Sequence, residues 1–155
     1  MATKPHLIVC ERTQRWATAW RRALGEGVTV GEVRSLTQVD ERLAGLALPI
    51  AVDASAFSAE RLLTGVARWS QAGSPVIVLG ATGQLAEEFA YREAGAVHVI
   101  ASPRQIGWAV AIVTRYRPAV PAPKPAELPL EQAAFERLPW GRFRKAGQPP
   151  AGQHS

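Results

Sequence analysis

Residues 49–53 read PIAVD, and residues 75–79 read PVIVL. Each is a short apolar run that begins with proline. The second is unbroken, which is typical of a strand that is covered on both faces of a sheet. The first run ends at Asp53, one of only two aspartates in the chain. Open α/β sheets place their sites at the carboxyl ends of their strands. The two runs therefore predict a parallel sheet with Asp53 at the edge where a site would lie.

The same alternation of strand-like and helical patterns extends in both directions from these runs. Strands are expected at 6–10, 28–33, 49–53, 75–79 and 97–100, and helices at 13–24, 36–44, 58–71, 84–94 and 103–116. Five such units in succession predict an α/β domain, with a parallel sheet and helices on both of its faces.

Polar residues in front of the helical patterns predict how the helices begin. Capping boxes are expected to start at Ser35 and at Ser102, and Pro103 would occupy the first helical position after Ser102. Thr13 is expected to cap the first helix, and Thr82 with the glycine after it the fourth.

Composition divides the 155 residues into three parts. We expect a domain at 1–117, a proline-rich linker at 118–129 and a tail at 130–155 that holds a short helix and a basic, aromatic segment. No apolar run approaches the length needed to span a bilayer, and no signal peptide is recognised, which favours a cytoplasmic protein without a membrane role. The net charge of +5 is spread along the chain, so nucleic acid is not the expected partner.

Four segments in the expected order carry a resemblance to a known family. They read LIVCE (7–11), PIAVDAS (49–55), PVIVLGAT (75–82) and EAGAVHVIASP (93–103). Over residues 5–117 this pattern resembles the receiver domain of bacterial response regulators. The resemblance implies a flavodoxin-like fold with the strand order 2-1-3-4-5.

The resemblance also implies where receiver chemistry would lie. Asp53 matches the aspartate that accepts a phosphoryl group. Glu11 matches an acidic residue that would hold Mg²⁺ together with Asp53, if the ion binds. An active phosphoacceptor that uses these two residues is therefore one alternative.

The remaining positions of the implied receiver site depart from the family pattern. Cys10 replaces an acidic ligand, Gly80 the switch hydroxyl, Val99 the switch aromatic residue and Ser102 the lysine. Without the lysine and one acid, much of the electrostatic stabilisation of phosphoryl transfer is lost. We therefore favour a structural or vestigial role for Asp53, and a non-enzymatic, phosphorylation-independent pseudo-receiver that needs no cofactor.

Such a module would act in signalling or assembly through protein–protein contacts, and a homodimer is one form of partner. In receivers the face made by the fourth helix, fifth strand and fifth helix commonly mediates pairing. By resemblance, that face would use Glu87, Tyr91, Arg104, Trp108 and Arg115.

Trp140 and Phe143 lie beyond the domain in an aromatic, basic segment. They are predicted either to dock on a partner or to pack on the same domain. A nucleic-acid adaptor acting through this tail is the last alternative.

Overall fold

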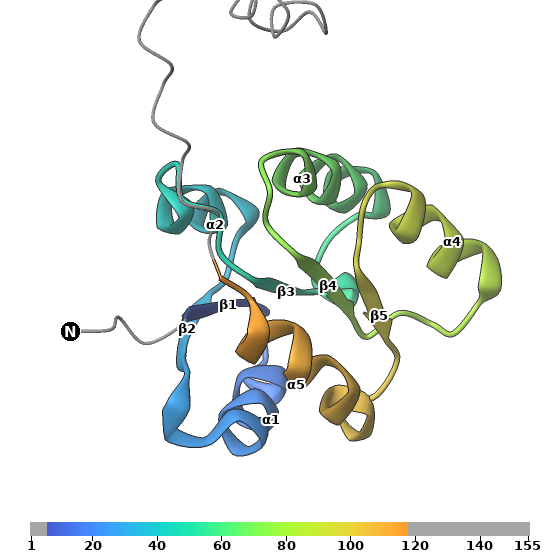
Figure 1. Cartoon of the computed structure of the whole chain (residues 1–155). Helices are drawn as coiled ribbons and strands as arrows, with labels where there is room; N and C mark the ends of the chain where they lie inside the picture. Colours follow the sequence, from blue (N-terminus) through green and yellow to red (C-terminus); the bar gives the residue numbers. More distant parts are fainter. Residues whose placement is uncertain (1–5, 118–155) are drawn as a thin grey trace, which may run out of the picture. The chain divides into compact units, whose positions relative to one another are not determined.

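The computed structural model of this chain describes residues 6–117. It contains one parallel sheet of five strands in the order β2-β1-β3-β4-β5. The strands are β1 (His6–Cys10), β2 (Thr29–Val33), β3 (Ile50–Asp53), β4 (Val76–Leu79) and β5 (His98–Ile100). Flavodoxin-like folds have this order, so the predicted fold class is confirmed (Figure 1).

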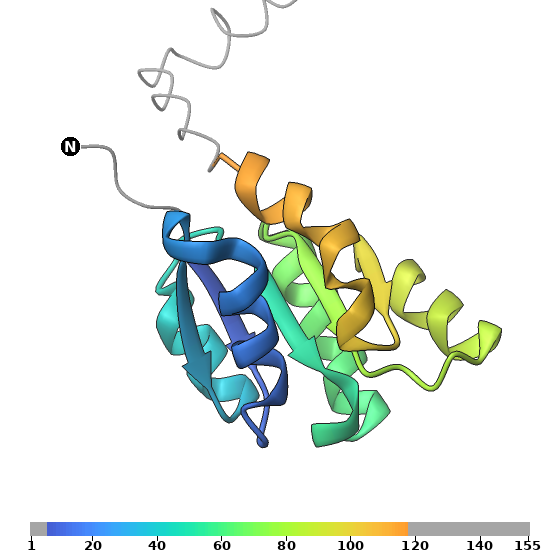
Figure 2. The same cartoon turned by 90° about the horizontal axis from the view of Figure 1, so that it is seen from below.

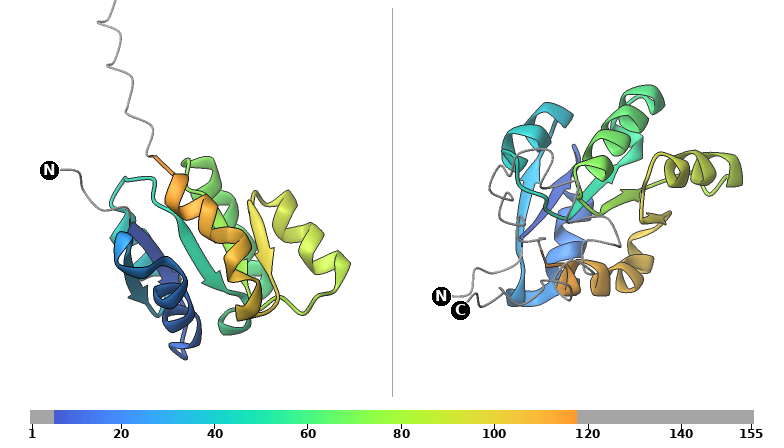
Figure 3. Two further views of the ribbon diagram at one scale, coloured as in Figure 1. Left: turned by 60° about the horizontal axis from the view of Figure 1, so that its bottom comes forward. Right: turned by 45° about the horizontal axis from the view of Figure 1, so that its top comes forward.

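Five helices cover the two faces of the sheet. They are α1 (Arg15–Leu24), α2 (Leu36–Leu43), α3 (Ala59–Gln71), α4 (Leu85–Glu93) and α5 (Ile106–Arg115). The helices α1 and α5 lie on one face, and α2, α3 and α4 lie on the other (Figures 1 and 2). Figure 3 shows α1 and α5 side by side over the sheet. Each face of the sheet is thus closed by its own layer of helices.

The alternation of side chains along β3 divides the core between these layers. Ile50 and Val52 pack with the residues of α2 and α3, whereas Ala51 packs with those of α1 and α5. All three side chains are fully buried. In the sheet, Val52 pairs with Cys10 on one side and with Val78 on the other. The central position of β3 explains why its apolar run has no polar interruption before Asp53.

The helix starts agree with the sequence at two of the four predicted caps. Ser35 accepts a hydrogen bond from the backbone N–H of Gln38 and caps α2. Ser102 opens a capping box, although Pro103 begins a 3₁₀ turn, η3 (Pro103–Gln105), before α5. The N-cap positions of α1 and α4 are Gln14 and Gln84, so the predicted caps at Thr13 and Thr82 are wrong.

The predicted linker and tail, with Trp140 and Phe143, lie outside the described residues. The predicted domain limits therefore stay a prediction. Within residues 6–117, no helix is both long and apolar enough to cross a membrane.

Candidate functional site

The carboxyl ends of the strands bring the predicted site positions to one edge of the sheet. Cys10 ends β1 and Glu11 follows it, Asp53 ends β3, and Gly80 follows β4. Ser102 lies two residues beyond β5. The sequence therefore placed these positions at the correct edge. What each side chain does there depends on contacts that local sequence patterns do not contain.

Asp53 is buried, with 4% of its surface exposed, and it bonds within its own loop. Its Oδ1 accepts hydrogen bonds from the backbone N–H of Ser55 at 3.0 Å and from the Ser55 hydroxyl at 2.7 Å. Asp53 thereby caps the short 3₁₀ turn η2 (Ala54–Ala56). These bonds are ones that an aspartate at a strand end commonly makes with its own loop, and the structural role favoured from the sequence stays a prediction.

Gly80 is pressed against Asp53 and Trp16. A Cβ atom at position 80 would lie 2.9 Å from Asp53 Oδ1 and 3.6 Å from Cζ2 of the Trp16 indole. Gly80 also has φ +68°, a backbone conformation that residues other than glycine rarely adopt. The carboxylate and the indole thus fill the space that a switch hydroxyl at this position would need.

Trp16 was not among the predicted site residues. It lies on the buried face of α1, and only 2% of its surface is exposed. The contact with Gly80 joins residues 64 positions apart, as their numbers show. No spacing rule along one helix could have predicted that contact.

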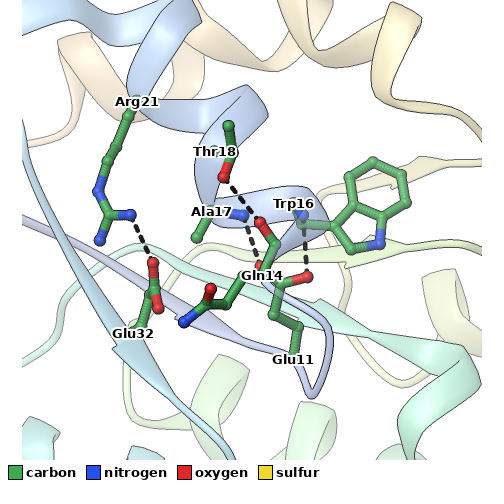
Figure 4. Close-up of polar contacts among 7 residues, drawn as sticks. All are labelled: Glu11, Gln14, Trp16, Ala17, Thr18, Arg21 and Glu32. Atoms are coloured by element: carbon green, nitrogen blue, oxygen red, sulfur yellow. Dashed lines mark hydrogen bonds and ion pairs between the residues drawn. The ribbon is translucent and has the colours of Figure 1, made fainter.

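Glu11 is directed into the start of α1 (Figure 4). Its Oε1 accepts from the backbone N–H of Ala17 at 2.6 Å, and its Oε2 from that of Trp16 at 2.9 Å. Only 3% of Glu11 is exposed. Glu11 thus satisfies the free N–H groups of the first turn that Thr13 was expected to satisfy, and its negative charge is favourable at a helix N-terminus.

Metal binding by Glu11 and Asp53 stays a prediction. Both carboxylates already accept hydrogen bonds from the chain. Among residues 6–117, no three histidine, cysteine or acidic side chains are gathered so that they could hold a metal ion.

Cys10 is fully buried beside this site. Burial, and secondarily the negative charge of Asp53, raise the pKa of its thiol to about 12. The thiol is therefore neutral at physiological pH and is a poor ligand for Mg²⁺, which prefers oxygen.

The other two degenerate positions also have structural surroundings. The Ser102 hydroxyl accepts from the backbone N–H of Arg104 at 3.4 Å as part of the turn before α5. Val99 is half-buried and packs against the core layer of α2 and α3. Ser102 therefore supplies no positive charge, and Val99 supplies no switch ring.

Thr82, two positions beyond Gly80, donates its hydroxyl hydrogen to Glu87.

A second region, the α4–β5–α5 face, contains large apolar side chains that are exposed. Trp108 on α5 is 71% exposed, and Leu85 and Phe89 on α4 are 83% and 60% exposed. Trp108 was predicted for this face from the sequence, whereas Leu85 and Phe89 were not, because the apolar residues of α4 do not form one clear stripe. Arg104 and Arg115 are exposed as expected. The expected surface position of Tyr91 is wrong, since this side chain is 3% exposed and packs inward.

A groove of about 290 Å³ runs along this face. Its walls come from α4, β5 and α5, and include Glu88, Arg92, His98, Gln105 and Trp108. His98 Nε2 is buried and has no hydrogen-bond partner among residues 6–117. Burial, reinforced by the charge of Arg92 and opposed by that of Glu88, lowers the pKa of His98 below its ordinary value of 6.5. The groove therefore favours a neutral imidazole.

Comparison with known proteins gives matches of structure only. No family model matches the chain, and no curated protein matches it in sequence. A CheY-like protein (TadZ) from Pseudomonas aeruginosa superposes with a TM-score of 0.60 at 15% identity, covering 77% of this chain and 100% of that one.

Two further solved structures give similar values. One is described as an atypical orphan response regulator with a phosphorylation-independent regulatory mechanism, with a TM-score of 0.58 at 17% identity over 74% of this chain and 99% of that one. The other is the beryllofluoride-activated NtrC4 receiver domain dimer, with a TM-score of 0.59 at 14% identity over 71% and 96%. This chain has the fold of response-regulator receiver domains.

Proposed function

We propose that this chain is a non-catalytic, phosphorylation-independent module for signalling or assembly, and that it pairs with a second copy of itself through the α4–β5–α5 face. The observation that carries the proposal is the exposure of Leu85 and Phe89 on α4 and of Trp108 on α5, the two helices whose residues line the groove from either side of β5. Exposed apolar side chains that gather on one face, rather than scatter singly, mark interaction surfaces.

The packing of α4 supports this choice of face. Tyr91 is the one fully buried side chain of α4. Leu85 and Phe89 lie one turn apart, and each is three residues before an α4 residue that lines the groove, Leu85 before Glu88 and Phe89 before Arg92. Trp108 borders the same groove from α5. A partner could bury all three apolar side chains in one contact, and aromatic anchors of this kind contribute much of the energy of interfaces.

The charges on this face favour a second copy of the chain as partner. Glu87, Glu88 and Glu93 belong to α4 together with Arg92, which pairs with Glu88, whereas Arg104 and Arg115 belong to η3 and α5. In a two-fold pair the same surface of both protomers forms the interface, so Glu87 and Glu93 of one protomer can face Arg104 and Arg115 of the other in both halves of the interface.

The surroundings of Asp53 support the phosphorylation-independent part of the proposal. The carboxylate is buried, it accepts two hydrogen bonds from Ser55, and Gly80 and Ser102 provide neither switch hydroxyl nor lysine. Of the similar structures, one is an atypical response regulator with a phosphorylation-independent mechanism and another is a receiver domain dimer, and both agree with the proposal.

Sedimentation velocity of the full chain over a concentration series tests the pairing. We expect a concentration-dependent dimer, and a dimer at least about tenfold weaker in Trp108→Asp, because a hot-spot tryptophan contributes about 2 kcal/mol or more. Leu46→Asp is the matched control, since Leu46 is 64% exposed but is not part of this face. A wild type that stays monomeric, or a dimer that Trp108→Asp leaves unchanged, would contradict the proposal.

The second arm tests phosphorylation. Wild type and Asp53→Asn are incubated with Mg²⁺ and acetyl phosphate, and intact mass is measured beside sedimentation. We expect no adduct and the same dimer in both proteins. A single phosphoryl adduct on wild type alone, with a change in its association, would support the phosphoacceptor alternative instead.

A further inference from the structure

A rim of arginines surrounds the carboxyl edge of the sheet. Arg12 lies in the loop after β1, Arg15 begins α1, Arg34 follows β2, and Arg104 lies in the turn after β5. All four are exposed. We call these four residues the arginine rim. Exposed positive charges that lie along one edge of a sheet attract negatively charged groups.

No carboxylate of the described chain neutralises the arginine rim by direct pairing. The salt bridges within residues 6–117 join Arg21 to Glu32, Arg68 to Asp40 and Arg92 to Glu88, and they include no member of the rim. Two acids at the same edge, Glu11 and Asp53, are buried and bonded to backbone and hydroxyl donors. Their negative charges still act at this edge, since both add to burial in raising the pKa of Cys10. Glu60, in the first turn of α3, is exposed, and Glu87, in the first turn of α4, is half-buried and bonded to Thr82. The acids of this edge are thus mostly buried or bonded within the chain, whereas the four arginine side chains are exposed and have no salt bridge among residues 6–117.

Two guanidinium groups of the rim are held against aromatic rings. The Arg12 guanidinium lies 5.4 Å from the centre of the Phe57 ring, and that of Arg15 lies 5.6 Å from the centre of the Trp16 ring. A guanidinium that stacks by its face keeps its N–H edges free to bind an anion. Because these side chains are already restrained, less conformational entropy is lost when they bind a partner.

Neighbouring contacts also order the loops that carry the other two arginines. The backbone N–H of Arg34 donates to the side chain of Gln38 at 2.7 Å. Arg104 lies inside the capping box that Ser102 opens. From β2 to β5 the sheet has four strand-to-strand steps, which span about 19 Å at the usual spacing. An extended peptide of about six residues covers that distance.

We propose that the arginine rim is a docking surface for an acidic segment of a partner protein. Carboxylates suit it because arginine binds them in a planar, bidentate geometry. Double-stranded nucleic acid suits it less, because proteins that bind the duplex through its backbone commonly contact about six to ten phosphates, and the rim has four arginines. This docking surface is separate from the dimer proposed above, with Arg104 as the one residue common to both.

The test uses the full chain and a fluorescein-labelled oligoglutamate peptide, with binding followed by fluorescence anisotropy. The test variant is Arg12→Gln with Arg34→Gln, which leaves Arg104 in place. The matched control is Arg22→Gln with Arg42→Gln, which removes two exposed arginines from the last turns of α1 and α2, at the opposite ends of those helices. Both variants have the same net charge.

We expect the oligoglutamate to bind about tenfold more weakly to the rim variant than to the control, since each exposed ion pair contributes up to about 1 kcal/mol. Binding to wild type should weaken with added salt, and an oligoglutamine peptide of equal length should not bind. Sedimentation of both variants should match wild type, which separates this proposal from the proposed dimer.

Two results would overturn the proposal. The first is equal loss of oligoglutamate binding in the rim variant and the control, because it would show attraction by net charge alone. The second is tighter binding to a double-stranded DNA of equal charge than to oligoglutamate, again lost in the rim variant, because it would assign the rim to nucleic acid.

Discussion

Two tryptophans show how differently this chain treats two regions of the receiver fold. Trp16 is 2% exposed, and its indole closes the edge of the sheet over Gly80 beside Asp53. Trp108 is 71% exposed on the α4–β5–α5 face. The region where the fold would hold a reactive site is packed like a core, and the region through which receivers commonly pair has its apolar side chains in solvent. The comparison supports the proposal that the exposed face binds a partner and that the edge around Asp53 contributes to stability.

The largest expected difference between the two regions is in the effect of truncating each tryptophan separately. Trp16→Ala should lower the free energy of unfolding by about 3–5 kcal/mol, because it removes a large buried ring and leaves a cavity. Trp108→Ala should change it by no more than about 0.5 kcal/mol, as expected for an exposed position. Urea unfolding followed by circular dichroism measures both. Similar losses in the two variants would remove the distinction between the regions.

Substituting two glycines separately tests whether Asp53 and Trp16 fill the space beside Gly80. Gly80→Ala should destabilise by about 2–4 kcal/mol, because the new Cβ lies 2.9 Å from Asp53 Oδ1 in a left-handed backbone conformation. Gly83→Ala is the control, because Gly83 has φ +79° and its added Cβ meets nothing within 4 Å. Its cost should be the backbone strain alone, about 1–2 kcal/mol. Equal losses in urea unfolding would mean that the contact with Asp53 contributes nothing.

A third pair tests which residue caps α1. Glu11→Gln should lower the free energy of unfolding by about 1–2 kcal/mol, since an amide can accept from only one of its two terminal atoms and the charge at the helix N-terminus is lost. Thr13→Ala should cost less than about 0.5 kcal/mol, because Thr13 is exposed and is not the N-cap. If the threonine change were the larger in denaturant unfolding, the cap predicted from sequence would have been correct after all.

The smallest expected effect is a dependence of stability on pH through His98. Its pKa in the folded chain is below the ordinary value of 6.5, so the unfolded chain binds a proton first as the pH falls. Stability should therefore be highest above pH 6.5 and decrease as the pH falls towards the folded pKa. His98→Gln should remove this part of the decrease. Paired urea titrations of wild type and variant on both sides of that pH measure it, and identical pH profiles would contradict the role of His98.

The sequence alone determined most of the fold. The apolar runs that end at Asp53 and Leu79, and the helical patterns between runs, predicted five strands and five helices within a few residues of their observed bounds. Ser35 and Ser102 began their helical segments as predicted. These features follow from neighbours in the chain, because strand burial and helix capping depend on residues two to four positions apart. The resemblance to receivers then supplied the strand order.

Tertiary structure decided what the site residues do. Glu11 caps α1 across a loop, Trp16 meets Gly80, and Tyr91 turns inward while Leu85 and Phe89 stay exposed on the same helix. Local patterns could identify each of these residues as acidic, apolar or aromatic. They could not say which neighbours from other elements would cover it, because burial and hydrogen bonding depend on how the layers pack together. The sequence thus determined where the carboxyl edge of the sheet and the α4–β5–α5 face lie. Only packing decided that the edge around Asp53 is filled by buried side chains and that the face keeps apolar side chains exposed.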